Sequence, residues 1–374
     1  MDVTAVIGTL LNLLLFIVIL GILVTVHEFG HFITAKKSGV HIHEFSIGMG
    51  KAIKTWKGKD GIDYSIRMLP IGGFVQMAGE IYEDDDTGDV KKEDFMCNKK
   101  WWQRLIILCA GVFNNFVLAI ILLFVVAMMI GAQSFEPRIY HVTEGSAVAD
   151  TQVKEVDENG NEVIVSGIVD GDLITKVNGK KVKTWDKTQL LFLLKSKNNE
   201  YEITVRHEDN KEETFTISPK EVEDEEGNKK YVFGIESMAT YEKGVIPALK
   251  WSVKKFCAVS EQMWMTLGAL FTGKLSINNL SGPVGIYSVV GETRKAGFAN
   301  VIMLTAYLSI NLGIMNILPI PALDGGHVLF LLVELLTRKK VNQKFEATAT
   351  TIFFFLLLAL MFYITIHDII VLVK

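Results

Sequence analysis

The chain has 374 residues, of which 49% are hydrophobic and 21% charged, and its mean hydropathy is +0.31. This composition is too apolar for an ordinary soluble protein and fits several membrane-spanning helices joined to a water-soluble part. The formal net charge of −4 gives no indication of nucleic-acid binding. The three cysteines are odd in number and widely spaced, so a disulfide framework is not expected.

The first apolar run covers residues 5–26 and ends directly at a cluster of polar residues. It is long enough to cross a bilayer as a helix, and because no basic segment precedes it, we expect it to be retained rather than cleaved as a signal peptide. On a helix, His27 and His31 lie one turn apart on the same face, so both imidazoles can reach one metal ion. Glu28 lies beside them and can take the proton of an attacking water. Alternatively, the three residues only cap an apolar helix at the membrane surface.

A polar stretch, residues 36–104, follows and carries twelve Lys or Arg residues. Since basic residues gather in cytosolic loops, this bias places the stretch in the cytosol and the N-terminus outside. Residues 40–48 and 64–69 alternate like strands, and residues 70–74 read as a turn into another strand. We therefore expect a small β-sheet or hairpin that dips towards the membrane.

Residues 105–131 predict a second membrane helix that returns outwards, with Trp101 and Trp102 at its cytosolic interface. The helix contains small residues that permit close packing, and it also contains Asn115. An intramembrane Asn requires a hydrogen-bond partner. Helix packing explains this segment most simply, and a position of Asn115 facing a functional site is the alternative.

Residues 135–243 are polar and mixed, with no apolar run long enough to span, and predict a soluble domain outside the membrane. Residues 167–180 resemble the Gly-Asp…Asn-Gly pattern of a PDZ domain, and a helical segment follows Trp185. Gly145, Ser146 and Ala147 precede this pattern, where the ligand-facing loop of such a domain is expected. PDZ domains accept a peptide as an added strand. The alternative is a folded ectodomain that binds nothing.

One segment departs from the PDZ pattern. Thr151 to Ser166 looks like an inserted hairpin that turns at Asn159-Gly160. After the soluble domain, Val245 to Leu270 predicts an amphipathic helix, whose lysines favour a position at the membrane interface over a span. Residues 280–286 then read as a turn punctuated by Gly and Pro.

The third apolar segment, residues 301–323, runs into a stretch with two prolines and two glycines before His327. These residues break or kink a helix at membrane depth, which is tolerated where protein or a cavity receives the freed backbone. Residues 328–336 resume as a helix towards a basic cytosolic cluster. Residues 351–373 predict the last span, which returns outside.

The first and third apolar helices both run from outside to inside, and Asp324 lies about as far along its helix as His27 does along its own. The two histidines and this carboxylate therefore fall at the same depth and can meet. Two His ligands and one carboxylate with an open fourth position are typical of catalytic zinc sites, so we expect one Zn²⁺. Asp324 could alternatively cap a helix after the proline break. His327 competes as third ligand, and we expect it only beside the site.

With these motifs the chain resembles the site-2 protease family of intramembrane zinc metalloproteases, of the bacterial RseP/RasP type with a single PDZ domain. The resemblance covers nearly the whole chain in the family's order. The matching segments are His27-Glu28-Phe29-Gly30-His31, Ala110-Gly111 to Asn115-Phe116, the PDZ-like domain, Gly282-Pro283-Val284-Gly285-Ile286, and Asn316 to Gly326.

The resemblance implies zinc ligands at His27, His31 and Asp324 and a general base at Glu28. It also implies that Asn316 and Pro319 position the extended backbone of the substrate. Asn115, a further substrate-positioning candidate, belongs to the helix packed beside the active site. The loop of residues 40–75 looks like a hairpin that aligns the substrate as a strand.

The resemblance also implies partners. The expected substrates are single-span membrane proteins, such as anti-sigma factors and signal-peptide remnants, cut in regulated intramembrane proteolysis. The PDZ-like domain would filter them by size or dock a peptide or a substrate ectodomain. A non-catalytic PDZ membrane scaffold is the alternative function, and an intact Glu28 favours the enzyme. A zinc transporter or sensor would need more intramembrane carboxylates than the spans contain.

The expected fold is therefore a polytopic α-helical membrane protein with about four transmembrane helices, one extracytoplasmic PDZ-like α+β domain and a small membrane-associated β-hairpin. We expect it in the bacterial cell membrane, with both termini outside and the active site towards the cytosol. The predicted segments are a first helix with the zinc motif (1–35), a cytosolic loop with the hairpin (36–104), a second helix (105–132), the PDZ-like domain (133–243), an amphipathic interfacial region (244–299), a third helix with the Asp ligand (300–340) and a fourth helix (341–374).

Overall fold

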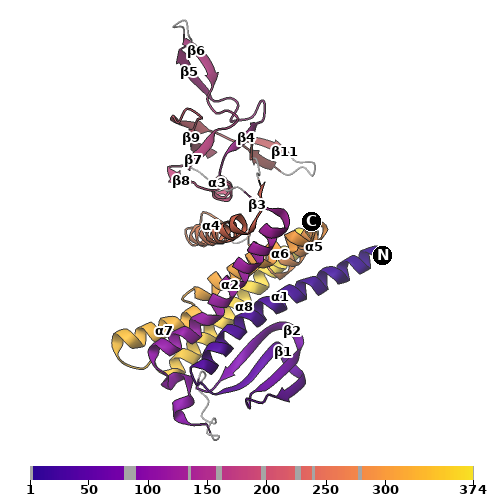
Figure 1. Cartoon of the computed structure of the whole chain (residues 1–374), viewed down its shortest axis with the longest axis vertical. Coiled ribbons are helices and arrows are strands. Elements are labelled where there is room, and N and C mark those ends of the chain that lie inside the picture. Colours follow the sequence, from indigo (N-terminus) through magenta and orange to yellow (C-terminus); the bar gives the residue numbers. More distant parts are fainter. Residues whose placement is uncertain are drawn as a thin grey trace. The chain divides into compact units, whose positions relative to one another are not determined.

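The computed structural model describes residues 3–79, 90–133, 136–156, 162–194, 199–223, 229–237, 241–276 and 280–373. The chain forms two compact units. One, the helical unit, comprises Met1–Met129 and Ile277–Lys374, and the other, the β-rich unit, comprises Ile130–Ser276 (Figure 1).

The helical unit is built on long apolar helices. By length and composition, four stretches among the described residues could each cross a membrane: Val6–Lys37, Trp101–Ile130, Phe298–Ile317 and Lys344–Ile370. This number agrees with the expectation from the sequence. The helices are α1 (Val3–Lys37), α2 (Trp101–Ile130), α5 (Pro283–Lys295), α6 (Phe298–Ile317), α7 (Asp324–Thr337) and α8 (Gln343–Val373), with two short 3₁₀ turns, η1 (Lys92–Asp94) and η2 (Met96–Asn98), ahead of α2.

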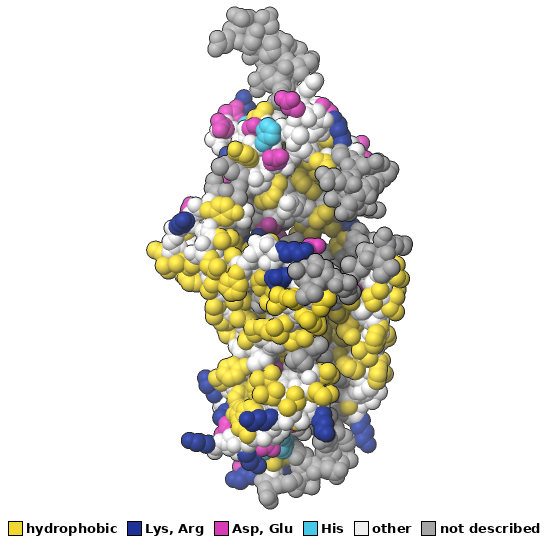
Figure 2. Space-filling model, turned by 90° about the vertical axis from the view of Figure 1, so that its right-hand side faces the viewer, with side chains coloured by type: hydrophobic (Ala, Val, Ile, Leu, Met, Phe, Trp, Pro, Cys, Tyr) yellow, Lys and Arg dark blue, Asp and Glu magenta, His cyan; other side chains and the backbone are white. Residues whose placement is uncertain are grey.

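Apolar side chains cover much of the outer surface of this unit (Figure 2). In the most apolar 18 consecutive residues of α8, no residue is buried inside the protein. Its exposed side chains include Phe354, Phe355 and Phe362. An apolar surface of this extent would be unfavourable in water, and it suits contact with lipid.

Two long strands, β1 (Ile42–Lys57) and β2 (Asp63–Met77), fold back on themselves to form a small sheet beside α1 (Figure 1). The first half of β1, residues 42–47, pairs with residues 73–77 and also with residues 63–66. The second half of β1 pairs with residues 63–67. Residues 73–77 are therefore an edge of the sheet. The predicted small sheet is confirmed in a more folded form, and its approach to the membrane stays a prediction.

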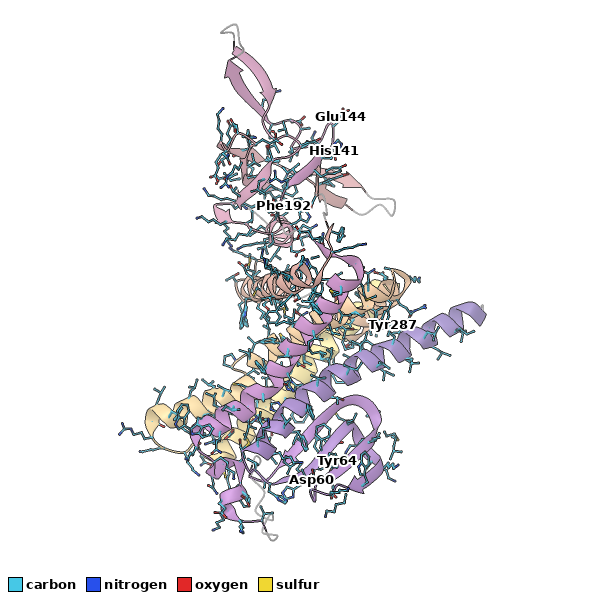
Figure 3. The ribbon with its side chains drawn as sticks, in the orientation of Figure 1. Asp60, Tyr64, His141, Glu144, Phe192 and Tyr287 are labelled. Carbon is cyan, nitrogen blue, oxygen red and sulfur yellow. The ribbon has the colours of Figure 1, made fainter. Side chains whose placement is uncertain are left out.

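A polar contact joins the turn of the hairpin to the end of α1. The Asp60 carboxylate accepts hydrogen bonds from Lys36 Nζ (2.6 Å) and from the Tyr64 hydroxyl (2.9 Å). Figure 3 shows Asp60 and Tyr64 close together in the hairpin. The Lys36 ammonium and then the Tyr64 hydroxyl lower the pKa of Asp60 to about 2.

One expectation for the last third of the chain needs correction, and another is confirmed. Residues 280–286 were expected as a turn, but α5 begins at Pro283. Proline is favoured at the first position of a helix, because the missing N–H has no partner there in any helix. The predicted break at the prolines is confirmed: α6 ends at Ile317, and α7 begins at Asp324, a few residues earlier than the predicted restart at residue 328.

The β-rich unit contains short strands around one four-stranded antiparallel sheet, in the order β10-β9-β7-β8. The other strands form two-stranded pairs. The elements are β3 (Ala132–Gln133), β4 (Ile139–Val142), β5 (Gln152–Val156), β6 (Glu162–Ser166), β7 (Leu173–Val177), β8 (Lys180–Lys181), α3 (Trp185–Leu193), β9 (Tyr201–Arg206), β10 (Glu212–Ile217), β11 (Lys220–Glu223), β12 (Lys229–Val232), β13 (Ile235–Ser237), β14 (Tyr241–Glu242) and α4 (Val245–Phe271).

Several local elements predicted from the sequence are present in this unit. Asn178 (φ 50°) and Gly179 (φ 72°) form the turn between β7 and β8, where both residues need positive φ. The expected inserted hairpin is present as β5 and β6, which pair with each other. Its turn at Asn159-Gly160 lies outside the described residues. The predicted amphipathic helix is α4, which contacts α3 through Lys255–Asp186 and Lys187–Glu261 ion pairs.

Candidate metal centre

Three polar side chains from two distant parts of the sequence meet inside the helical unit. His27 and His31 come from α1, and Asp324 is the first residue of α7. Asp324 Oδ2 lies 3.1 Å from His27 Nε2 and 3.5 Å from His31 Nε2. The two Nε2 atoms are 3.2 Å apart, and both histidines are buried. These three ligand atoms could therefore surround one metal ion.

Glycines allow α2 to lie directly against this part of α1. A Cβ atom at Gly111 would lie 2.8 Å from His27 Nε2, and one at Gly30 would lie 2.9 Å from the backbone N of Gly111. Real Cβ atoms do not approach other atoms so closely. The Phe29-Gly30 and Ala110-Gly111 pairs are therefore the local reason that the imidazoles fit between the two helices.

The backbone of α2 orients His31. His31 Nδ1 lies 2.8 Å from the carbonyl oxygen of Ile107. Because a carbonyl oxygen only accepts, Nδ1–H must donate, and Nε2 then carries the lone pair. That lone pair is directed at the space shared with His27 and Asp324, as required of a metal ligand.

Asn115, also on α2, is fully buried, and its Nδ2 lies 3.1 Å from His27 Nδ1. Its Oδ1 has no hydrogen-bond partner among the described residues. A 180° rotation of the amide would bring Oδ1 to His27 Nδ1–H and satisfy it, and would leave the Nε2 lone pair of His27 facing the cluster. Both histidines would then donate through Nδ1, and both would present Nε2.

The chemistry of the three clustered side chains fits a bound metal ion. Two imidazole nitrogens and one carboxylate oxygen are all acceptors, and Asp324 Oδ2 is buried with no hydrogen-bond donor among the described residues. Three convergent acceptors are unfavourable in a buried place unless a cation lies between them. The donor set of two histidines and one carboxylate is the one used by catalytic zinc sites with an open position.

The break between α6 and α7 delivers Asp324 to the cluster. Leu323, not Asp324, is the N-cap residue of α7, and its backbone is extended. The cap alternative for the Asp324 carboxylate therefore has no support in this geometry. Gly325 and Gly326 follow, and a side chain at either position would collide with the backbone of the preceding turn. The two glycines thus allow the tight turn that directs Asp324 towards α1.

Glu28 lies between the cluster and the edge of the small sheet. The backbone of Val75 hydrogen-bonds the Glu28 carboxylate. A Cβ at Gly73 would lie 3.4 Å from Glu28 Cγ, so the sheet edge passes directly along this side chain. Glu28 is therefore held near the cluster without being one of its three convergent ligands.

The other residues singled out from the sequence have varied positions. Asn316 Nδ2 lies 3.4 Å from His27 Nε2, whereas Pro319 is exposed in the connection between α6 and α7. His327 Nδ1 lies 3.0 Å from Glu346 Oε1 and is not one of the three clustered residues. The roles of Asn316, Pro319 and Asn115 in substrate positioning stay predictions.

The loop expected to face a peptide lies in the β-rich unit. The carbonyl of Gly145 accepts a hydrogen bond from Lys220, and Ser146 Oγ accepts one from the Ala149 N–H (3.2 Å). A cavity of about 380 Å³ in the same unit is lined by other residues, among them Phe192, Leu193, Phe233 and Gln262. Gly145, Ser146 and Ala147 do not line that cavity.

Two contributors to the centre could not be recognised from the sequence. The carbonyl of Ile107 has no sequence pattern, because every residue carries a carbonyl. Gly111 was noted only as a small residue for helix packing. The Ala110-Gly111 pair on an apolar helix was the available indication that something bulky must fit there.

Gly111→Ala is expected to reduce zinc binding strongly, because the added methyl group occupies the place of both imidazoles. We expect at least a tenfold loss of zinc affinity, which is the scale at which groups that orient metal ligands act. The measurement is the zinc content of purified protein after dialysis against a chelator. Gly268→Ala on α4 is the matched control, because a Cβ there meets nothing within 4 Å. Equal zinc content in all three proteins would contradict the prediction.

Comparison with known proteins agrees with this geometry. Residues 15–360 match the model of the family described as Peptidase family M50. The chain is 31% identical to the regulator of sigma-W protease RasP of Bacillus subtilis, across 95% of this chain and 97% of that protein. It is 30% identical to the zinc metalloprotease RasP of Bacillus licheniformis, again across 95% of this chain and 97% of that protein.

Proposed function

The chain belongs to peptidase family M50 and is a zinc metalloprotease, and from this premise we propose that it cuts the membrane-spanning segments of single-span membrane proteins. One observation carries the proposal. The two histidines and Asp324 converge inside a unit of apolar helices, with Glu28 beside them. A peptidase centre at this place has the hydrophobic segments of other membrane proteins as its natural substrates.

We assign His27, His31 and Asp324 as the residues that hold zinc. When bound, the ion supplies Lewis-acid chemistry, because it lowers the pKa of water and polarises a peptide carbonyl. Glu28 is the general base: it accepts the proton of the attacking water and passes it to the leaving amine. The hydrogen bond from Val75 keeps its carboxylate at the sheet edge, next to where a substrate backbone would lie.

The substrate must be extended at the bond that is cut, since the carbonyls of an intact helix are used in its own hydrogen bonds. The edge formed by residues 73–77 offers backbone groups to such a chain, which would add to the sheet as a further strand. Asn316, with its amide at the centre, and Pro319 in the next turn would position the other side of the substrate. Helix-weakening residues in the substrate should therefore favour cleavage.

The proposed topology follows the basic residues. The loop between α1 and α2 would lie in the cytosol and both termini outside, so that the centre faces the cytosolic side of a bacterial cell membrane. The β-rich unit would then lie outside, as a PDZ-like domain that filters or docks substrates. The cavity beside Phe192 and Phe233 is a better place for a bound peptide than Gly145 to Ala147, because apolar side chains line part of a hollow there.

The predicted segment boundaries, including the interfacial region of residues 244–299, stay part of this proposal. The exposed side chains of α4 support the interfacial position: Ile246, Leu249, Val253 and Trp264 recur at helical spacing, with Lys250 and Lys254 beside them. Such a helix lies along a membrane surface.

Anti-sigma factors and signal-peptide remnants are the proposed substrates. The name of the Bacillus subtilis relative refers to regulation of sigma-W. Substrates could be captured with Glu28→Gln protein in its native membrane and identified by mass spectrometry. If the captured proteins were not single-span membrane proteins, or if no protein were captured, this substrate class would be contradicted.

Removal of zinc tests the proposed reaction directly. Purified protein stripped by a chelator should lose all cleavage of a model single-span substrate, and added Zn²⁺ should restore it. Loss without recovery would be explained by unfolding, so the thermal unfolding of the stripped protein must be followed in parallel. Undiminished cleavage by a folded, zinc-free protein would favour a non-catalytic PDZ scaffold accompanied by a contaminating protease.

A further inference from the structure

Helix α7 carries a stripe of inward-facing residues that begins at the metal centre. Asp324, His327, Leu331 and Glu334 follow at intervals of three, four and three residues, so they share one face of the helix. Leu331 is buried in the core, and His327 pairs with Glu346 of α8. The remaining face of α7 is apolar and exposed: Leu329, Leu332, Leu335 and Leu336.

Glu334, at the far end of this stripe, forms an ion pair with Arg104 of α2. Arg104 Nη1 lies 2.6 Å from Glu334 Oε2, and the side chains are only 18% and 15% exposed. The other oxygen, Oε1, accepts a hydrogen bond from the backbone N–H of Val341 (3.1 Å). Removal of one partner of such a pair leaves an uncompensated charge in a place with little water, so the pair holds the two helices together.

Few other contacts could replace the bond between Arg104 and Glu334. A polar cavity of about 420 Å³ lies beside it, lined by Arg104, Glu334, His327 and Lys340 among others. Arg104 Nε is buried and has no acceptor among the described residues, so its guanidinium is held through the contact with Glu334. Rotation of α7 about its own axis would break this contact and would move Asp324 by the same angle.

Arg104 also lies close to the groups that orient the histidines. It is three residues, about one turn, before Ile107, whose carbonyl receives His31 Nδ1–H. Asn115, next to His27, lies further along the same helix. One helix thus orients both histidines and, through Arg104, fixes the helix that carries Asp324.

We propose that the Arg104–Glu334 ion pair positions Asp324 for zinc binding, by fixing the rotation and depth of α7 relative to α2. The inference rests on the proposed ligand set and adds two positioning residues to it. Neither side chain touches the metal or the substrate. Their effect passes through the helix, over the nine residues that separate Glu334 from Asp324.

The test is the zinc affinity of the full-length protein, measured by competition with a chromogenic chelator. Glu334→Gln keeps the shape of the side chain and removes its charge, and we expect it to weaken zinc binding about tenfold. Arg104→Lys, which keeps the charge but loses the planar fork, should weaken it less. Glu44→Gln is the matched control, because it breaks the Arg67–Glu44 pair of similar exposure (22% and 18%) away from α2 and α7. Its zinc affinity should equal that of the wild type.

A second measurement separates positioning from general stability. With Co²⁺ in place of Zn²⁺, the visible absorption bands report the arrangement of the ligands, and Glu334→Gln should change them. Arg104→Glu combined with Glu334→Arg should restore both the bands and the affinity. If folded Glu334→Gln protein binds zinc as tightly as the wild type with unchanged bands, or if Glu44→Gln loses affinity equally, the inference is wrong. Failure of the wild type itself to bind zinc would instead overturn the proposed function.

Discussion

Glu28→Gln is expected to abolish cleavage and to leave the zinc content unchanged. The amide has the shape of the carboxylate, so the helix and the clustered ligand atoms of His27, His31 and Asp324 stay in place. It cannot accept the proton of water, and loss of a general base costs about 10² to 10⁴ in rate. The measurement is the cleavage rate of a single-span substrate by variant and wild type, each normalised to its bound zinc.

The zinc content is the internal control of this experiment. A variant that loses both zinc and activity would show only that the centre has been disrupted. A variant that keeps zinc and still cleaves at the rate of the wild type would remove Glu28 from the mechanism.

Asp324→Ala is expected to lose zinc together with activity. The substitution removes one of three ligands and leaves two imidazoles. The lost carboxylate oxygen lies 3.1 Å from His27 Nε2 and 3.5 Å from His31 Nε2. A site of three protein ligands that loses one should bind zinc at least a hundredfold more weakly, beyond the range caused by a change in a group that only orients a ligand. Zinc content by mass spectrometry, at equal protein concentration, measures this.

Asp368→Asn provides a matched control for Asp324→Ala. Asp368 is a buried carboxylate of the same unit, and it accepts hydrogen bonds from the backbone N–H groups of Gly282 (2.9 Å) and Gly285 (2.8 Å) at the start of α5. Its variant should keep zinc. Loss of zinc in both variants would mean that any buried carboxylate is needed for the fold, and it would remove the argument for Asp324 as a ligand.

The spacing of His27 and His31 predicted a shared face because both residues lie on one uninterrupted helix. Such local geometry can be read from a sequence, and so could the long apolar stretches, which depend only on composition and length. The meeting with Asp324 needed a further step, the comparison of depth along two helices. The structure places the three side chains together, and their assignment as zinc ligands stays a prediction.

Features that depend on the packing of distant segments could not be predicted in the same way. The Ile107 carbonyl becomes specific only when α2 lies against α1. The double pairing of residues 42–47 depends on a bend that the alternation of strands does not reveal. Helix α5 was not predicted, because Gly282 and Pro283 together usually indicate a turn. In this chain Pro283 is the first residue of the helix.

The β-rich unit shows a similar limit. The Asn178-Gly179 turn is encoded by two adjacent residues and was readable, because positive φ at both positions favours this pair. The cavity beside α3 is instead formed by Phe192 and Phe233, which are distant in the sequence. No local pattern joins them, so the cavity could not be predicted from the sequence. Gly145 to Ala147 were predicted to face a peptide because they precede the PDZ-like pattern, and that role stays a prediction.

Zinc chemistry within the membrane can be tested by the mass of the products when purified protein and a single-span substrate are reconstituted together in liposomes. The proposed function predicts one cut inside the apolar segment, seen with the wild type and absent with Glu28→Gln protein. Cuts only in the water-soluble flanks, or equal products from both proteins, would contradict it.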